Sequence, residues 1–189
     1  MSLDWILKLA NLGRVTRWRL ALALHGGRVG RRCAIAPGVR LECGRGRPIV
    51  LGDGVRLLRG VVLSTRPGGR ITLESRVYVG EYGIVRSAAE ICIARDTIIA
   101  PHVHIEDFDA AEGAPDHGPP AADPIRIGRD VWFGAGVTVR RGVQVGDQAV
   151  LGAGAVADRD IPDRGVAVGV PARVFRFRGE PRGEGKRPD

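Results

Sequence analysis

The sequence predicts an all-β solenoid, and three observations carry that prediction: a repeat of six residues, turn residues at fixed places within the repeat, and few aromatic side chains. Five six-residue units run without interruption over residues 127–156. Each opens on an apolar residue, and a small apolar residue stands four positions later. Neither a helical period nor strand alternation produces a strict spacing of six. The spacing is typical of short-strand coils that bury their apolar rows only by stacking. The opening residues are Ile127, Phe133, Val139, Val145 and Leu151, followed four positions later by Val131, Val137, Val143, Ala149 and Ala155.

The composition fits one domain with a narrow interior. The chain has 189 residues, of which 44% are hydrophobic and only 5% aromatic. Its formal net charge is +8, but the basic residues are scattered, and charge without a recognition motif is weak evidence for nucleic acid. We therefore expect no nucleic-acid partner. Three cysteines without metal-ligand spacing leave one unpaired, which favours a reducing compartment, the cytoplasm.

Residues 1–27 form the first predicted element, an amphipathic helical segment. Apolar residues recur there at helical spacing with basic residues between them, and Gly26 and Gly27 end the pattern. Its charges are too frequent for a membrane span, and it lacks the organisation of a signal peptide. We expect this helix to cap the first coil or pack on a subunit. Weak association with a membrane surface is the alternative.

Residues 28–178 form the second predicted element, the solenoid itself. The spacing of six appears in pieces from Ile35 onward, with turn-like insertions between the pieces. Residues 110–125 are polar and proline-rich, and the apolar register resumes directly after them. This stretch is therefore predicted to be an excursion loop, the kind of segment where binding and chemistry concentrate. Residues 179–189 have the composition of a disordered tail.

Several segments together resemble the hexapeptide-repeat acyltransferases, in the branch of galactoside, maltose and capsular or lipopolysaccharide sugar O-acetyltransferases. They are the hexads opening at Ile93 and Ile127, Gly152-Ala-Gly-Ala-Val, Asp160-Ile-Pro and Gly169-Val-Pro-Ala-Arg-Val. The resemblance implies a left-handed parallel β-helix that assembles as a homotrimer. It also implies transfer of an acyl group, most often acetyl, from acyl-CoA to a hydroxyl or amine of a sugar or amino sugar. No metal is required by this chemistry.

The resemblance also implies a set of coenzyme-binding residues. Ala135 and Ala153 correspond to positions whose backbone contacts the pantetheine arm of CoA. Arg159, Arg173 and Arg176 correspond to positions that meet its nucleotide end and phosphates, which suits the charge and fork geometry of a guanidinium. Without the resemblance, tight turn packing and solvated arginines would explain the same residues.

The main departure from the family concerns the catalytic base. Hydroxyl attack on a thioester needs a group that accepts the proton, a task suited to histidine. Family members carry Ile-x-Asp-His-Asp-His before the loop, whereas this chain reads Ile105-Glu-Asp-Phe-Asp-Ala110. Gly80 likewise stands where some relatives have an acceptor-binding asparagine.

Three explanations stay open. His117 in the loop could replace the base, oriented by Asp107 or Asp109. An amine acceptor, with its nucleophilic lone pair, could need less assistance. Alternatively, the chain has lost catalysis and serves as a noncatalytic scaffold or binding protein.

His102 and His104 are further candidates, because their spacing of two places both on the outside of one coil facing the groove. With Asp107 they suggest a metal site such as that of the zinc-binding hexapeptide-repeat carbonic anhydrases. The chain lacks a clear three-histidine pattern of that type, so no metal site is predicted.

Overall fold

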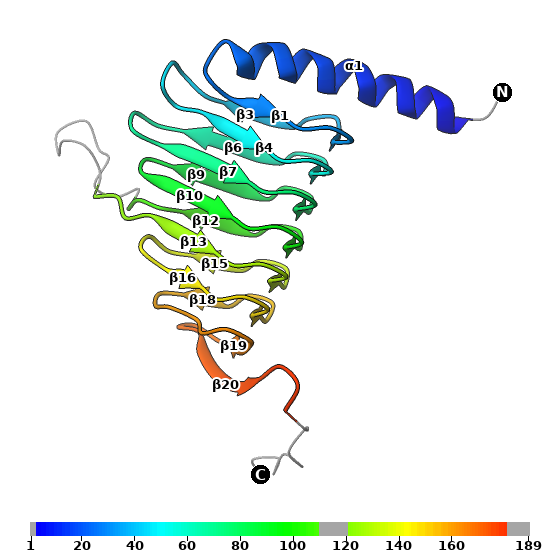
Figure 1. Cartoon of the computed structure of the whole chain (residues 1–189). Coiled ribbons are helices and arrows are strands. Elements are labelled where there is room, and N and C mark those ends of the chain that lie inside the picture. Colours follow the sequence, from blue (N-terminus) through cyan, green and yellow to red (C-terminus); the bar gives the residue numbers. More distant parts are fainter. Residues whose placement is uncertain (1–2, 110–120, 181–189) are drawn as a thin grey trace.

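The protein is a triangular stack of short parallel strands, seen from the side in Figure 1. It is described from a computed structural model, which covers residues 3–109 and 121–180. Three sheets, here called A, B and C, form the faces of the stack. Sheet A comprises β1 (Arg28–Val29), β4 (Ile49–Leu51), β7 (Arg70–Leu73), β10 (Glu90–Ile93), β13 (Ile125–Ile127) and β16 (Gln144–Val145).

Sheets B and C complete each coil, because the chain passes from A to B to C and back to A. Sheet B comprises β2 (Ala34–Ile35), β5 (Arg56–Leu57), β8 (Tyr78–Val79), β11 (Ile98–Ile99), β14 (Trp132–Phe133), β17 (Val150–Leu151), β19 (Gly165–Val168) and β20 (Arg173–Phe177). Sheet C comprises β3 (Arg40–Glu42), β6 (Val62–Thr65), β9 (Ile84–Ser87), β12 (His104–Glu106), β15 (Thr138–Val139) and β18 (Val156–Ala157).

The interior confirms the predicted repeat. All five opening residues and all five residues four positions later are at most 3% exposed. Each opener stacks on its counterpart one coil away, as Ile127 does on Val145. Burying this continuous apolar column is the main source of stability, at roughly 25 cal/mol per Å² of apolar surface removed from water.

Coil length varies at one corner only. Leu51, Leu57 and Leu63 follow one another at intervals of six through sheets A, B and C. The return from C to A is variable: Leu51 pairs with Leu73, 22 positions on, whereas Ile127 pairs with Val145, 18 positions on. The predicted excursion at residues 110–125 lies at this same C–A corner, between β12 and β13. Its residues 110–120 lie outside the described residues, and β13 begins at Ile125.

The helix α1 (Leu3–Ala23) lies across the first coil, as Figure 1 shows. Val15 and Leu22 are buried on its inner face. The Asn11 side chain accepts a hydrogen bond from Ile35 N at 2.9 Å and donates to Cys33 O at 3.2 Å. The helix therefore covers both the apolar end and part of the open strand edge. Within the described ranges, no helix has the length and apolar character needed to cross a membrane.

At the other end, β19 pairs in parallel with β17, and β20 returns antiparallel to β19. The connection between β19 and β20 contains a cis peptide bond at Val170-Pro171. This hairpin closes sheet B at the C-terminal end of the stack.

Candidate functional site

In the last coils, the turns at the corner between sheets B and C expose only glycine and alanine. Its turns there are Gly134-Ala-Gly136 and Gly152-Ala-Gly154, and Ala135 and Ala153 at their tips are exposed. A Cβ added at Gly136 or Gly154 would meet no atom within 4 Å. The turns stack directly, because Gly154 N donates to Ala135 O at 2.8 Å. Ala135, Gly136, Ala153 and Gly154 thus form a strip without bulky side chains, called here the bare ledge.

The bare ledge ends at aromatic rings in the turns toward the N-terminus. Gly136 N donates to Pro101 O at 3.0 Å, which places the His102 turn next along the corner. The rings of His102 and Tyr82 stack with their centroids 5.4 Å apart. Three of the predicted site residues, Ala135, Ala153 and His102, therefore share one corner. Gly80 has no room for the side chain of an asparagine, because a Cβ there would lie 2.7 Å from Pro101 N.

A hollow of about 170 Å³ lies on the outer face of sheet C, where the chain leaves the coil for the excursion. It spans two adjacent strands, since His104 of β12 pairs in register with Thr138 of β15. This hollow, called the excursion hollow, is lined by His104, Glu106, Phe108, Asp109, Thr138, Val139, Arg140 and Arg141. It combines an imidazole, two carboxylates and two guanidinium groups in a space suited to a small polar ligand.

The side chains of His104, Glu106 and Arg86 form a polar group on the outer face of sheet C, and the first two line this hollow. His104 and Glu106 flank the buried Ile105 and so point outward together. His104 Nε2 lies 3.5 Å from Glu106 Oε2, and Arg86 Nη1 lies 3.8 Å from Glu106 Oε1. The Glu106 side chain is only 14% exposed. Both His104 Nε2 and Glu106 Oε1 are buried without a hydrogen-bond partner in the structure.

Asp107 and Asp109 have different surroundings. Asp107 is fully buried and accepts hydrogen bonds from Ser87 Oγ at 2.7 Å, Ala88 N at 2.7 Å and Ala89 N at 3.1 Å. It therefore fixes the turn between β9 and β10 and is absent from the lining of the excursion hollow.

Asp109 does line the excursion hollow, where Arg141 Nε donates to it at 2.6 Å and an Arg140 amino group at 3.3 Å. The hydrogen bond from Arg141, with that from Arg140, holds the pKa of Asp109 below its usual value. Arg141 also pairs with Asp123 on the returning side of the excursion.

Residues at and beyond the family's histidine positions are only partly within the described ranges. Phe108 occupies the first of these positions and is 3% exposed beneath the Arg66 guanidinium, which lies 4.2 Å from the ring centre. Its backbone bridges to Ala122, so the two ends of the excursion lie side by side. Ala110 at the second position and His117 lie outside the described residues.

The predicted phosphate-binding arginines lie beyond β18 and on β20. The structure brings two of them together, because Arg159 Nε and Arg173 Nη1 each lie 3.3 Å from Asp158 Oδ1. Arg176 lies over the ring of Phe175, 5.6 Å from its centroid.

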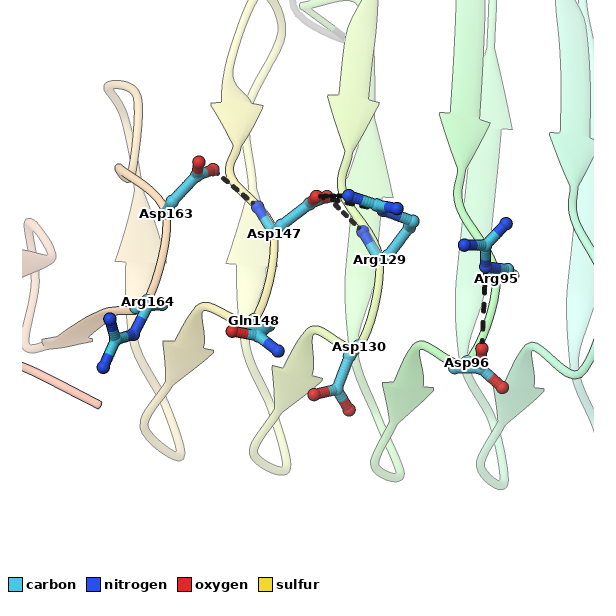
Figure 2. A pocket seen from close by; sticks show the side chains of 8 residues that line it. All are labelled: Arg95, Asp96, Arg129, Asp130, Asp147, Gln148, Asp163 and Arg164. Carbon is cyan, nitrogen blue, oxygen red and sulfur yellow. Dashed lines mark hydrogen bonds and ion pairs between the residues drawn. The ribbon is translucent and has the colours of Figure 1, made fainter. Parts of the chain in front are cut away.

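A more spacious hollow, of about 460 Å³, follows the corner between sheets A and B (Figure 2). Several of its charged side chains already have partners within the protein. Arg129 Nε donates to Asp147 at 3.0 Å, Asp163 accepts from Asp147 N at 2.8 Å, and Asp130 pairs with Arg178 at 3.1 Å. Charged groups that already have partners offer little to a ligand, so the smaller excursion hollow is the better candidate for chemistry.

Comparison with known proteins finds relatives of this repeat. Residues 124–159 match a family model described as the hexapeptide repeat of succinyl-transferase. Over 92 residues, the chain is 39% identical to galactoside O-acetyltransferase from Escherichia coli. Over these segments the chain is similar to hexapeptide-repeat acyltransferases. The match covers 46% of this chain but only 43% of the E. coli protein.

Solved structures place this hexapeptide-repeat protein among left-handed parallel β-helices. AntD, an N-acyltransferase from Bacillus cereus in complex with dTDP and 3-hydroxybutyryl-CoA, superposes with a TM-score of 0.72 at 18% identity, covering 86% of this chain and 88% of that chain. A galactoside acetyltransferase in complex with coenzyme A has a TM-score of 0.55 at 26% identity, covering 85% and 69%. The predicted fold is confirmed.

Sequence reasoning named His104 but missed its neighbours Glu106 and Arg86. The spacing of two between His104 and Glu106 was a usable signal, because alternate residues of a strand share a face. Arg86 lies 20 positions before Glu106, in a pairing that follows only from the strand register.

Proposed function

We propose that this protein transfers an acyl group from acyl-CoA to a hydroxyl or amine of a sugar or related small acceptor. Acetyl is the acyl group that we expect. The observation that carries the proposal is the bare ledge leading toward the excursion hollow, in a chain that is 39% identical over 92 residues to a galactoside O-acetyltransferase. A slender pantetheine arm fits along a corner that carries no bulky side chains. Ala135 and Ala153 would contact it, and Arg159, Arg173 and Arg176 would meet the phosphates of CoA.

The ledge and the hollow are close enough for one reaction. Thr138, which pairs with His104, follows Ala135 by three residues, a span of about 10 Å at most. A thioester at the end of the bare ledge would therefore reach an acceptor held in the excursion hollow. Direct attack on the thioester needs no covalent enzyme intermediate, and the protein contributes mainly by orienting the reactants.

Assembly as a homotrimer is part of the proposal. Sheet B presents an outward apolar row of Tyr78, Ile98, Trp132 and Val150, aligned by strand register. Ile98 is 49% and Trp132 57% exposed. Contiguous apolar surface of this kind marks an interaction site. A second copy covering this row would give the ledge an opposite wall.

Location in the cytoplasm is a separate prediction, which rests on the cysteine usage.

Thiol release tests the function. The full chain is incubated with acetyl-CoA and a panel of sugars and amino sugars, and free CoA thiol is measured with a thiol-reactive dye. Ala153→Leu fills the bare ledge and should raise KM for acetyl-CoA at least 10-fold. Arg59→Leu places the same side chain on the same corner outside the ledge and should leave KM unchanged.

The competing interpretation is a noncatalytic scaffold. It predicts no thiol release with any acceptor and no CoA binding in calorimetry. Acceptor-dependent thiol release by the unmodified chain would exclude it. Mass spectrometry of the acylated acceptor would separate O-transfer from N-transfer.

A further inference from the structure

We propose that His104 is the base that takes the acceptor's proton, and that Glu106 and Arg86 position it. This inference rests on the proposed acyl transfer and names the residue that replaces the histidine absent at position 110. His104 lines the excursion hollow, is 39% exposed and lies on a rigid strand. A base on a strand is held more precisely than one on a loop.

Glu106 assigns different tasks to the two ring nitrogens of His104. Its carboxylate faces Nε2 at 3.5 Å without a hydrogen bond in the structure. Closing that gap in the substrate complex would place the proton of the neutral ring on Nε2 and leave a lone pair on Nδ1. The carboxylate also stabilises the imidazolium that forms when Nδ1 takes a proton. Arg86, 3.8 Å from the other Glu106 oxygen, holds that carboxylate in place. Among the described residues, the buried oxygen Oε1 of Glu106 has no hydrogen-bond partner. Catalytic hydrogen bonds that are long without substrate can shorten when it binds.

Other titratable groups near the excursion hollow are engaged elsewhere. Asp109 is held by Arg140 and Arg141, which keeps it ionised and makes it a weak base. Asp107 is buried with three donors on its carboxylate. His102 lies at the B–C corner, stacked on Tyr82, and does not line the hollow.

In this reaction His104 carries one proton from the acceptor to the leaving thiolate. The acceptor oxygen or nitrogen attacks the thioester carbonyl carbon, a C–O or C–N bond forms, and the acceptor's proton moves to Nδ1 of His104. The tetrahedral intermediate then expels CoA sulfur as the C–S bond breaks. The leaving thiolate takes the proton from His104, which returns the ring to its starting state.

The central test is His104→Ala in the full chain. We expect kcat to fall about 100-fold or more, the usual contribution of a general base, with KM for acetyl-CoA within twofold of the unmodified protein. Added imidazole should restore part of kcat, which a folding defect would not allow. His25→Asn removes a histidine at the end of α1, far along the chain from the hollow, and should leave kcat unchanged.

Glu106→Gln tests the positioning role. It keeps the shape of the side chain but removes its charge, so we expect kcat to fall about 10-fold, with KM unchanged. The acidic limb of the pH–rate profile, along which a general base loses its proton, should shift to lower pH. Circular dichroism and CoA binding by calorimetry check the fold of each variant. His104→Gln provides a second substitution if His104→Ala does not fold.

These experiments separate failure of the proposed function from failure of the inference about His104. If the unmodified chain releases no thiol with any acceptor, both the proposed function and this inference fail. If the unmodified chain is active and His104→Ala retains full kcat, the transferase stands and this inference alone is overturned. Loss of activity in His117→Ala together with full activity in His104→Ala would assign the base to the loop.

Discussion

At the scale of single residues, strand alternation decides the task of each acidic side chain around the excursion. Glu106 points outward beside His104, whereas Asp107 next to it is fully buried and holds three donors of the β9–β10 turn. Asp109 lies at the rim, bound by two arginines. In our proposal Glu106 positions the base, whereas Asp107 holds a turn and Asp109 pairs with two arginines.

The first prediction concerns Asp107→Ala. Removing the carboxylate leaves two backbone N–H groups and the Ser87 hydroxyl without their acceptor in a buried place, so the free energy of unfolding should fall by about 3 kcal/mol. Urea unfolding measures the change. Asp130→Ala, which removes one exposed ion pair with Arg178, should cost at most about 1 kcal/mol. Equal losses in the two variants would contradict the structural role of Asp107.

The second prediction concerns acid stability at the corner between sheets A and B. Hydrogen bonds from the Arg129 side chain and backbone hold the pKa of Asp147 below its usual value (Figure 2). A depressed folded-state pKa stabilises the fold above the unfolded pKa of about 3.9, and this stability disappears as pH falls through the folded pKa. The Tm of the unmodified protein should exceed that of Asp147→Asn at pH 5–7.

That Tm difference should shrink below about pH 4, where protonation removes the advantage of the carboxylate. Thermal unfolding of both proteins from pH 7 to pH 2 follows it. Because the pair is solvent-accessible, high salt should also reduce the difference at pH 7. A difference that is unchanged at pH 2 would show that the charge of Asp147 is not responsible.

At the scale of secondary-structure elements, α1 has two faces with different tasks. Its inner face packs Val15 and Leu22 on the first coil, and Arg14 Nε donates to Ile35 O at 2.8 Å. Its outer face exposes leucines, including Leu20 at 68%. The helix therefore stabilises the solenoid by covering the end of the apolar column.

The third prediction compares two leucines of this helix. Leu22 is 1% exposed, so Leu22→Ala should lower the free energy of unfolding by about 2–4 kcal/mol through lost burial and a residual cavity. Leu20→Ala has the same chemistry on the exposed face and should change it by about 0.5 kcal/mol or less. Urea denaturation of both variants provides the comparison. Similar losses would mean that α1 packs through a different face.

The elements also show how far sequence reasoning extends. The register over residues 127–156 was predictable, because every opener must be buried and its period is strictly six. Contacts between coils were harder, since coil length differs at the C–A corner. His104 and Glu106 are two positions apart on one strand. Arg86, in contrast, lies 20 positions before Glu106 and comes next to it only because β9 pairs with β12. Asp107 was predicted beside the loop histidine, and a two-residue pattern cannot reveal that Ser87, Ala88 and Ala89 occupy its oxygens.

At the scale of the whole molecule, the three faces of the prism differ in character. The outward row on sheet A includes Thr72, Cys92, Arg126 and Gln144, whereas the corresponding row on sheet B is Tyr78, Ile98, Trp132 and Val150. Sheet C carries the excursion hollow. A stack with one apolar face and a polar hollow on another face is suited to an assembly in which sheet B of one copy meets the ledge of the next.

The fourth prediction follows from that asymmetry. Ile98→Arg places a charge in the middle of the apolar row, and burying an unpaired guanidinium against a neighbouring copy is costly. We expect the unmodified chain to run as a trimer in size-exclusion chromatography with light scattering, and Ile98→Arg to run as a monomer at micromolar concentration. Thiol release from acetyl-CoA should fall with the trimer, because each site would lose its opposite wall.

Thr72→Arg provides the matched control, because it introduces the same side chain at an outward position on the polar sheet A. It should leave both the trimer and the thiol release intact. Circular dichroism of the two variants should be alike, since neither position faces the core. A monomeric unmodified chain that still transfers acyl groups would show that one protomer forms the complete site, whereas a trimer unaffected by Ile98→Arg would place the subunit contact on another face.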